Sequence, residues 1–271
     1  MIGKQIRLDR IRDRDTGKFI ILPIDHGVTI GPVHGINDIG KVINWAAEGG
    51  ATAVVEHKGM VEHGYRGKGR DIGLIVHLSA STSISEFPNS KTLVGSVEEA
   101  VKLGADAVSV HVNIGDVNER QMLEDFGKIS KECLNYGMPL LAMVYPRGKN
   151  IKNCFDKTLV SHCARLAAEL GADVVKVSFT GNVDSFKEVV RCTPIPVLIA
   201  GGEKSGSARE VFEMVEAAVE AGASGISIGR NVFQHDNPKK MLQALTNIVN
   251  GKFNSVEALK FLNNKKVYSI K

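Results

Sequence analysis

The feature that most constrains the fold is a short cassette that occurs four times along the chain. In each copy an amphipathic stretch ends in Gly-Ala, and a short run rich in apolar and β-branched residues follows. Glycine can adopt the left-handed conformation that ends a helix, and the small alanine lets the chain pass closely into a sheet. The cassette therefore predicts a repeated helix-then-strand unit. Its copies are Gly50-Ala51, Gly104-Ala105, Gly171-Ala172 and Gly222-Ala223.

Eight apolar runs have the composition of parallel strands that are buried on both faces. We expect these strands at residues 19–25, 53–57, 74–78, 107–112, 139–145, 174–179, 197–200 and 225–228. Helical patterns lie between them at 38–48, 97–103, 119–136, 159–170, 185–191 and 208–221. This alternation, with no linker, predicts an α/β fold with a single (β/α)₈ TIM barrel over residues 1–271 rather than a doubly wound sheet with a second domain. From about residue 252 to 271 we expect a short C-terminal helical extension with a frayed end.

Charge and hydropathy exclude several classes of partner. The chain has 34 Lys and Arg against 30 Asp and Glu, a net charge of +4, and its most charged stretch, from Lys4 to Lys18, mixes both signs. Such a mixture is unlike a basic arm that binds nucleic acid. The longest aliphatic runs are far shorter than the ~20 residues that cross a bilayer. We therefore expect a cytoplasmic protein with no nucleic-acid or membrane partner.

The four cysteines are expected to be reduced, because they form no C-x-x-C pair and the sequence shows no secretory context. They are Cys133, Cys154, Cys163 and Cys192.

Polar residues stand at the ends of the predicted strands, which is where TIM-barrel enzymes carry their chemistry. Lys176 is the strongest of these signals, because it lies between valines on a strand expected to be buried on both faces. Burial favours the neutral amine, which can attack a ketone to form a Schiff base. The alternative is a structural lysine that is ion-paired, with Asp25 as its partner.

Asp25 and Tyr145 also end predicted strands and could move protons in a Schiff-base cycle. Their alternative roles are a helix or loop cap for Asp25 and a packed aromatic ring for Tyr145. Arg147, two residues beyond Tyr145, could hold a carboxylate or a phosphate through paired N–H groups, or form a surface ion pair.

Two glycine-containing turns follow the seventh and eighth predicted strands, at Gly201-Gly202 and Gly229-Arg230. In this fold, backbone N–H groups at that place commonly bind phosphate. Glycines are also common in any turn from strand to helix, but two such turns side by side favour a phosphorylated substrate.

Eight histidines raise the alternative of a zinc-dependent aldolase. Its candidate ligands are His57, His63, His77 and His111. His57 and His63 are six residues apart with Gly59 between them, a spacing that does not place them on one helix face. We therefore expect no metal and no cofactor.

Taken together, the motifs resemble those of the archaeal-type class I aldolases over nearly the whole chain. They are Ile24-Asp25-His26-Gly27-Val28, Glu56-His57-Lys58-Gly59, His77-Leu78-Ser79, Tyr145-Pro146-Arg147-Gly148, Lys176, Ala200-Gly201-Gly202 and the run from Gly229 to His235. The resemblance implies Lys176 as the Schiff-base lysine, Asp25 as the proton acceptor and Tyr145 as the proton donor. The substrate-binding residues that it implies are Asp25, His26, Gly27, Val28, Thr29, Tyr145, Pro146, Arg147, Lys176, Gly201, Gly202, Gly229 and Arg230.

Within that family, the resemblance implies a transaldolase-like reaction in the biosynthesis of aromatic amino acids through 3-dehydroquinate. The donor would be a keto-sugar phosphate, 6-deoxy-5-ketofructose 1-phosphate, and the acceptor L-aspartate semialdehyde. The alternatives are an aldolase that joins dihydroxyacetone phosphate to aspartate semialdehyde, a fructose-bisphosphate aldolase, and a non-catalytic barrel that binds a sugar phosphate. The resemblance also implies a homo-oligomer. Glu203-Lys204-Ser205 and the basic tail after Asn264 depart from the family's pattern.

Overall fold

The fold is a closed barrel of eight parallel strands, seen in a computed structural model that describes residues 1–204 and 206–264. Neighbours around the barrel follow the order β1-β10-β9-β8-β7-β6-β3-β2. The strands are β1 (Phe19–Pro23), β2 (Ala53–Glu56), β3 (Gly73–His77), β6 (Ala107–Ile114), β7 (Leu140–Pro146), β8 (Val174–Val177), β9 (Val197–Ala200) and β10 (Gly225–Ser227). All eight expected strands form, and the predicted TIM barrel is confirmed.

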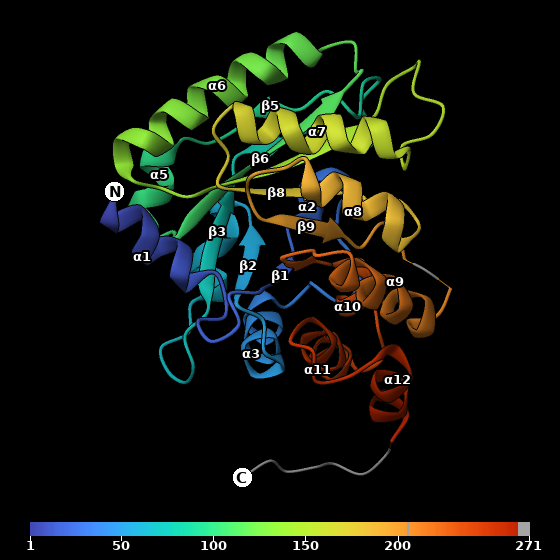
Figure 1. The fold of residues 1–271 in the computed structure, drawn as a ribbon. Helices are drawn as coiled ribbons and strands as arrows, with labels where there is room; N and C mark the ends of the chain where they lie inside the picture. The colour runs from blue at the N-terminus through green and yellow to red at the C-terminus, as the bar shows by residue number, and fades with distance from the viewer. Residues whose placement is uncertain (205, 265–271) are drawn as a thin grey trace.

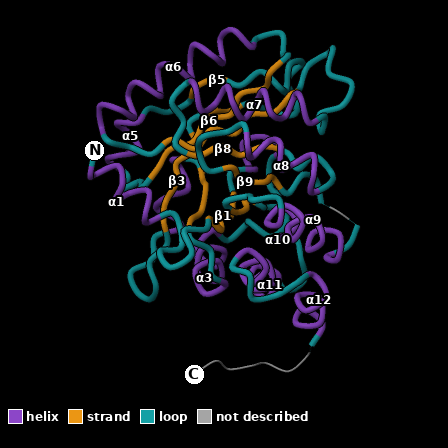
Figure 2. Tube along the Cα trace, viewed as in Figure 1, coloured by secondary structure: helices purple, strands orange, loops and turns teal. Residues whose placement is uncertain are grey.

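Helices surround the strands, which lie at the centre of Figure 2. The predicted helices correspond to α3 (Ile39–Gly49), α5 (Val97–Lys102), α6 (Glu119–Tyr136), α7 (Lys157–Glu169), α8 (Val183–Arg191) and α9 (Ala208–Glu220). The further ones are α1 (Ile2–Arg10), α2 (His26–Ile30), η1 (Lys58–Met60), α4 (Val61–Gly64), α10 (Arg230–Phe233), α11 (Pro238–Val249) and α12 (Ser255–Asn263). Helix α12 confirms the expected helix near the C-terminus, and residues 265–271 of the predicted frayed tail lie outside the described residues. Among the described residues, no helix is long and apolar enough to cross a membrane.

The glycines of the cassette have the conformation that the sequence predicts. Gly50, Gly104, Gly171 and Gly222 have φ of 93°, 78°, 92° and 98°. This left-handed backbone is strained for residues with a Cβ atom, so glycine suits these helix ends. The alanine after each glycine is buried where the chain enters the barrel.

The core has two layers, because successive side chains of a strand point to opposite faces. Ile20 and Leu22 of β1 pack between the barrel and the helices. Phe19 and Ile21 point into the barrel, where they pack with Ile11, which follows α1. The inward side chains toward the amino ends of the strands are apolar, so this part of the barrel is filled rather than hollow.

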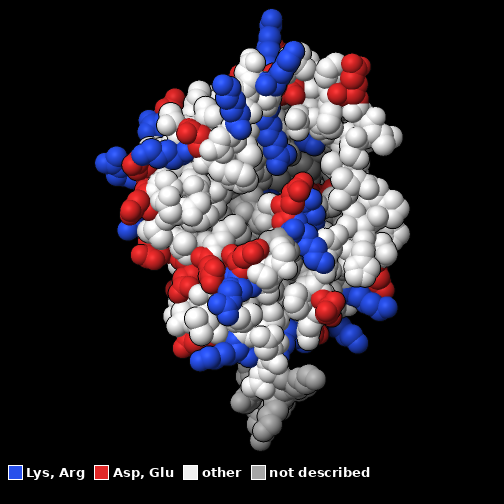
Figure 3. All heavy atoms as spheres, turned by 90° about the vertical axis from the view of Figure 1, so that its right-hand side faces the viewer, with Lys and Arg blue, Asp and Glu red and all other residues white. Residues whose placement is uncertain are grey.

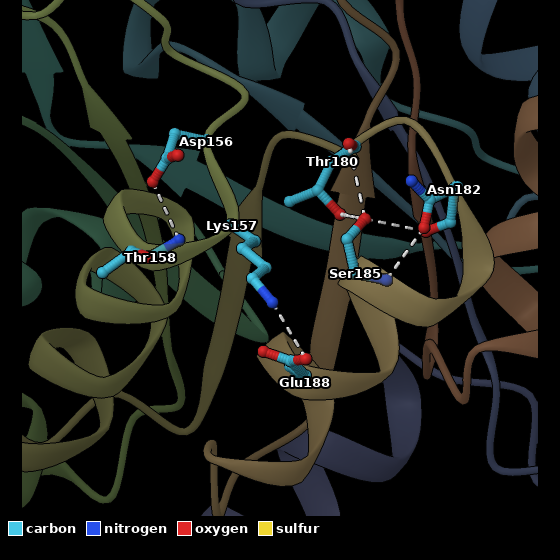
Figure 4. A network of polar contacts seen from close by, with 7 residues as sticks. All are labelled: Asp156, Lys157, Thr158, Thr180, Asn182, Ser185 and Glu188. Carbon is cyan, nitrogen blue, oxygen red and sulfur yellow. Dashed lines mark hydrogen bonds and ion pairs between the residues drawn. The ribbon is translucent and has the colours of Figure 1, made fainter.

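Side-chain caps fix the loop that follows β8, the strand of Lys176 (Figure 4). The Asn182 side chain accepts a hydrogen bond from the Ser185 amide at the start of α8, and the hydroxyls of Thr180 and Ser185 are 2.7 Å apart. A salt bridge of 3.0 Å between Lys157 and Glu188 joins α7 to α8. N-caps of this kind contribute about 1 kcal/mol each.

A hairpin that the sequence analysis did not predict leaves the barrel after β3. Its strands are β4 (Ser79–Ala80) and β5 (Thr92–Leu93), and they pair antiparallel. Two residues per strand are too few to produce a visible alternation of polar and apolar residues, so pattern reasoning could not find them.

Candidate active site

Polar side chains replace the apolar filling toward the carboxyl ends of the strands. The inward positions of β2, β3, β6 and β8 continue from apolar residues to His57, His77, His111 and Lys176. The arrows of β6 and β9 point to the right in Figure 1, and Figure 3 looks at that side, where a hollow lies near the centre with Lys and Arg side chains along one edge. The polar end of the barrel interior is therefore the candidate active site.

Lys176 lies on β8 with only 7% of its surface exposed, as the sequence predicts. Val175 and Val177 on either side of it point outward into the helix layer. Burial lowers the pKa of Lys176 to about 8, although the nearby Asp25 carboxylate opposes this change. With such a pKa, about a tenth of the amine is neutral at pH 7, compared with less than a thousandth for an ordinary lysine.

The Asp25 carboxylate lies at the start of α2, between two histidine rings. Its Oδ1 is 3.5 Å from His26 Nδ1, and its Oδ2 is 4.0 Å from His77 Nε2. Burial alone would raise the pKa of Asp25, but His77, His26 and the Lys176 ammonium together lower it to about 2. Asp25 is therefore ionised at neutral pH. No ion pair among the described residues joins it directly to Lys176, so the contacts do not favour the alternative of a structural ion pair.

Tyr145 ends β7, the strand that pairs with β8, and Met143, two residues before it, is the register partner of Lys176. The ring of Tyr145 contacts the His111 ring, with centroids 5.1 Å apart, and the Arg147 guanidinium lies over it at 4.7 Å. Burial raises the pKa of Tyr145 well above its usual value, with Arg147 opposing. At neutral pH the phenol keeps its proton and can donate it.

The two glycine turns after β9 and β10 lie side by side. Arg230 Nη2 donates a hydrogen bond of 3.0 Å to the Gly202 carbonyl oxygen. A Cβ atom on Gly229 would stand 2.7 Å from the Pro23 carbonyl oxygen, so only glycine fits there. Arg230 Nε is buried and has no hydrogen-bond partner among the described residues, which suits it to an anionic ligand. We call the turns of Gly201-Gly202 and Gly229-Arg230 the glycine corner.

The remaining expected residues lie at different depths around the mouth. Gly27, Val28 and Thr29 form α2, with Val28 exposed and the Thr29 carbonyl accepting a hydrogen bond from the Ser83 amide of the hairpin loop. Pro146 is buried at the end of β7.

Sequence reasoning missed two residues of the site. On the sequence alone, His77 is a possible zinc ligand and part of a family motif with no place in the site, whereas in the structure its Nδ1 is 2.7 Å from Ser109 Oγ and its Nε2 is 4.0 Å from Asp25 Oδ2. The position of His77 near the end of a predicted strand could have identified it as a site residue. Lys91 precedes β5, and burial, with Arg147 second, lowers its pKa to about 8. The segment around Lys91 is polar and has no motif or periodicity that would have identified Lys91 as a site residue.

The histidines are not arranged as a metal site. The rings of His57 and His77 meet edge to face with centroids 5.2 Å apart, while His63 lies on α4 and His111 contacts Tyr145. In the part of the chain that the structure describes, no group of three or more His, Cys, Asp or Glu side chains could hold a metal ion. The four cysteines, which lie within that part, are free thiols.

Comparison with known proteins gives consistent matches. The model of the DeoC/LacD family aldolases matches residues 19–235. The chain is 45% identical to 2-amino-3,7-dideoxy-D-threo-hept-6-ulosonate synthase 1 of Archaeoglobus fulgidus, over 97% of both chains. It is 38% identical to the 2-amino-4,5-dihydroxy-6-oxo-7-(phosphonooxy)heptanoate synthase of Streptomyces griseus, over 91% of this chain and 90% of that one. An archaeal fructose-1,6-bisphosphate aldolase, solved with its catalytic lysine covalently bound to a carbinolamine intermediate, is 33% identical with a TM-score of 0.84, over 91% of this chain and 99% of that one.

Proposed function

The chain belongs to the DeoC/LacD family of aldolases, and on that basis we propose that it is a class I aldolase of the transaldolase type, a 2-amino-3,7-dideoxy-D-threo-hept-6-ulosonate synthase. It would transfer a three-carbon methyl-ketone unit from 6-deoxy-5-ketofructose 1-phosphate to L-aspartate semialdehyde, in the biosynthesis of aromatic amino acids through 3-dehydroquinate. The observation that carries this proposal is the buried Lys176, whose pKa is lowered by burial and which shares the site with an ionised Asp25 and a protonated Tyr145.

The first step joins the donor to the enzyme. The neutral Lys176 amine attacks the ketone carbon beside the donor's methyl group, and a C–N bond forms as the carbonyl oxygen becomes a hydroxyl. Tyr145 donates the proton that lets this hydroxyl leave as water. The product is an iminium ion between Lys176 and the donor.

The second step breaks the donor. The iminium nitrogen draws electrons from the carbon–carbon bond that links the three-carbon unit to the rest of the sugar. As the bond breaks, Asp25 accepts the proton of the substrate hydroxyl, and the phosphorylated aldehyde fragment leaves. An enamine of three carbons, without phosphate, remains on Lys176.

The third step forms the product. The enamine carbon attacks the aldehyde carbon of aspartate semialdehyde, and Asp25 returns its proton to the new alkoxide. Water then adds to the iminium carbon and gives one proton back to Tyr145, which forms a carbinolamine. The hydroxyl proton of the carbinolamine moves to nitrogen as the C–N bond to Lys176 breaks, which releases the ketone product and the free amine. Tyr145 and Asp25 have their original protonation states again at the end of the cycle. The proposed steps therefore need no other proton donor or acceptor.

Binding of the donor is assigned to the residues around this centre. We assign the donor's phosphate to the glycine corner, because backbone N–H groups of such turns commonly bind phosphate and Arg230, whose guanidinium contacts Gly202, adds a positive charge there. His26, the first residue of α2, borders the same corner, since a Cβ atom on Gly229 would stand 2.7 Å from His26 Cε1. We further propose that the enzyme works in the cytoplasm as a homo-oligomer.

The second candidate joins dihydroxyacetone phosphate to aspartate semialdehyde. The similarity to the Streptomyces griseus enzyme favours it, since that enzyme's name places a phosphonooxy group on carbon 7, where the name of the Archaeoglobus fulgidus enzyme has a deoxy position. The two candidates therefore differ in whether the unit held by Lys176 carries phosphate.

Product analysis tests the proposal. The purified protein is incubated with aspartate semialdehyde and, in parallel reactions, the ketofructose phosphate or dihydroxyacetone phosphate, and products are identified by mass spectrometry. We expect an unphosphorylated seven-carbon product from the first donor and little or none from the second. Efficient condensation of dihydroxyacetone phosphate would favour the second candidate, and no product from either would contradict both.

A further inference from the structure

The mouth of the barrel has a second cationic corner that no step of the mechanism uses. It consists of Lys91 and Arg147, and we call it the lysine corner. Arg147 lies over the Tyr145 ring, and Lys91 lines the same small cavity as His111, whose ring also contacts Tyr145. The lysine corner therefore borders the proton donor of the reaction.

The position of Lys91 is fixed by the loop that carries it. The Asn113 side chain donates a hydrogen bond of 2.6 Å to the Asn89 carbonyl oxygen, and Ser90 Oγ donates one of 2.6 Å to Asp116. These two contacts tie the loop to the end of β6, where Asn113 is the register partner of Tyr145. Lys91 is the next residue after Asn89 and Ser90, so these contacts also hold its backbone near the end of β6.

The Lys91 side chain is also oriented. Its Nζ donates a hydrogen bond to Ser81 Oγ, and that hydroxyl donates its own proton to the Pro88 carbonyl oxygen. Asp25 raises the pKa of Lys91, whereas burial and Arg147 lower it. The hydrogen bond to Ser81 therefore fixes the direction of the ammonium group.

Neither residue of the lysine corner forms an ion pair among the described residues, and the Asp25 carboxylate acts on Lys91 only from beyond ion-pair distance. Lys91 is partly buried, whereas Arg147 is exposed. A partly buried cation beside a second cation is stabilised when an anion joins them. We expect an anionic group of a substrate to pair with Lys91 and Arg147.

The two corners of the mouth lie on opposite sides of β8, the strand of Lys176. The glycine corner follows β9 and β10, whereas Arg147 follows β7 and the loop of Lys91 is tied to β6. The mouth can therefore hold two anionic groups in separate places, on either side of Lys176.

From this arrangement we propose that Lys91 and Arg147 bind the carboxylate of the aldehyde acceptor, an inference that rests on the proposed function. The lysine corner presents an ammonium and a planar guanidinium, the groups that pair well with a carboxylate, whereas the glycine corner presents the backbone turns that suit a phosphate. Binding there places the acceptor beside Tyr145, so its aldehyde carbon can approach the enamine on Lys176. Lys91 is thereby assigned to acceptor specificity.

The test compares Lys91→Met with Lys149→Met, a matched loss of an exposed lysine near the mouth. We expect Lys91→Met to raise KM for aspartate semialdehyde about 10- to 100-fold, the usual effect of losing one charge-assisted contact, while KM for the donor and the yield of donor trapped on Lys176 by borohydride change less than about twofold. Lys149→Met should match the wild type. Lys91→Arg should restore most of the acceptor affinity, and thermal melting verifies that each variant folds.

An acceptor without the carboxylate sharpens the test. The wild type should use 3-aminopropanal far less efficiently than aspartate semialdehyde, and Lys91→Met should lose most of this preference. An unchanged acceptor KM in Lys91→Met, or a rise in donor KM instead, would overturn the assignment, the second result placing the donor's phosphate at the lysine corner. Failure of the wild type to use aspartate semialdehyde would contradict the proposed function itself, so the two failures are distinguishable.

Discussion

The two ends of the barrel interior differ in what fills them. Toward the amino ends of the strands, Phe19 and Ile21 pack with Ile11 in an apolar plug. Toward the carboxyl ends, Asp25 and Lys176 lie among histidines and arginines whose charges shift one another's pKa values. The apolar end therefore stabilises the fold, whereas the polar end buries charged groups at a cost in stability because the reaction needs them. Substitutions at the apolar end should mainly lower stability, and substitutions at the polar end should mainly lower the turnover rate.

The largest effect is expected from Lys176→Met. Methionine has a similar volume and no charge, so the variant should remain folded and have a melting temperature at or above that of the wild type. Without the amine no Schiff base can form, and the turnover rate should fall by a factor on the order of 10⁴ or more. Steady-state kinetics and thermal melting measure the two quantities, with Lys149→Met as the control. A variant with substantial activity would contradict the role of Lys176.

Tyr145→Phe should lower the turnover rate by about 10²- to 10⁴-fold, the usual contribution of a positioned acid or base. The ring remains in contact with His111, so donor binding and the fold should be retained. Asp25→Asn is expected to behave similarly. Tyr136→Phe changes a largely exposed ring and serves as the control. If Tyr145→Phe turned over as fast as the wild type when chemistry is rate-limiting, Tyr145 would have a structural role only.

At the apolar end, Phe19→Ala should destabilise the protein by about 3 to 5 kcal/mol, because Phe19 is fully buried and its removal leaves a cavity. Denaturant unfolding measures this change. At a temperature where the variant is folded, its turnover rate should stay within about twofold of the wild type. Phe155→Ala, at an exposed position, should have little effect on stability. A large loss of turnover in folded Phe19→Ala would show that the two ends are not separate.

A smaller effect is expected at Glu56, which points outward from β2 into the helix layer. Glu56 is buried, its Oε2 has no partner among the described residues, and burial raises its pKa from 4.5 to about 7. The folded state therefore binds this proton more tightly than the unfolded state, so stability is greatest below pH 4.5 and falls as pH rises through about 7.

Glu56→Gln removes that pH dependence, because the amide is neutral at all pH values. The variant should be more stable than the wild type at pH 8, by at most about 3 kcal/mol, and nearly equal to it at pH 4. Denaturant unfolding at both pH values measures the difference, with Glu62→Gln at an exposed position as the control. Equal stability of Glu56→Gln and the wild type at pH 8 would show that Glu56 has a partner when ionised.

The barrel, and the position of most candidate site residues at the carboxyl ends of its strands, could be predicted from the sequence because their signals are local. Each strand is a short apolar run, and a charged residue such as Lys176 inside one of them needs an explanation wherever the strand lies. The position of Lys91 depends instead on contacts between residues far apart in the chain, from Asn89 to Asn113 and from Ser90 to Asp116. The pairing of His77 with Ser109 likewise joins two strands, so no spacing along the chain reveals it.

The most direct test of the account is the mass of the adduct on Lys176. The protein is incubated with 6-deoxy-5-ketofructose 1-phosphate, reduced with borohydride, digested and analysed by mass spectrometry. The account predicts a reduced three-carbon unit without phosphate on the peptide that contains Lys176, and weak or no trapping of dihydroxyacetone phosphate. The uncleaved donor trapped at the first iminium would still carry its phosphate, so the decisive species is the three-carbon adduct. An adduct on a different lysine, or a three-carbon adduct that retains phosphate, would contradict the account.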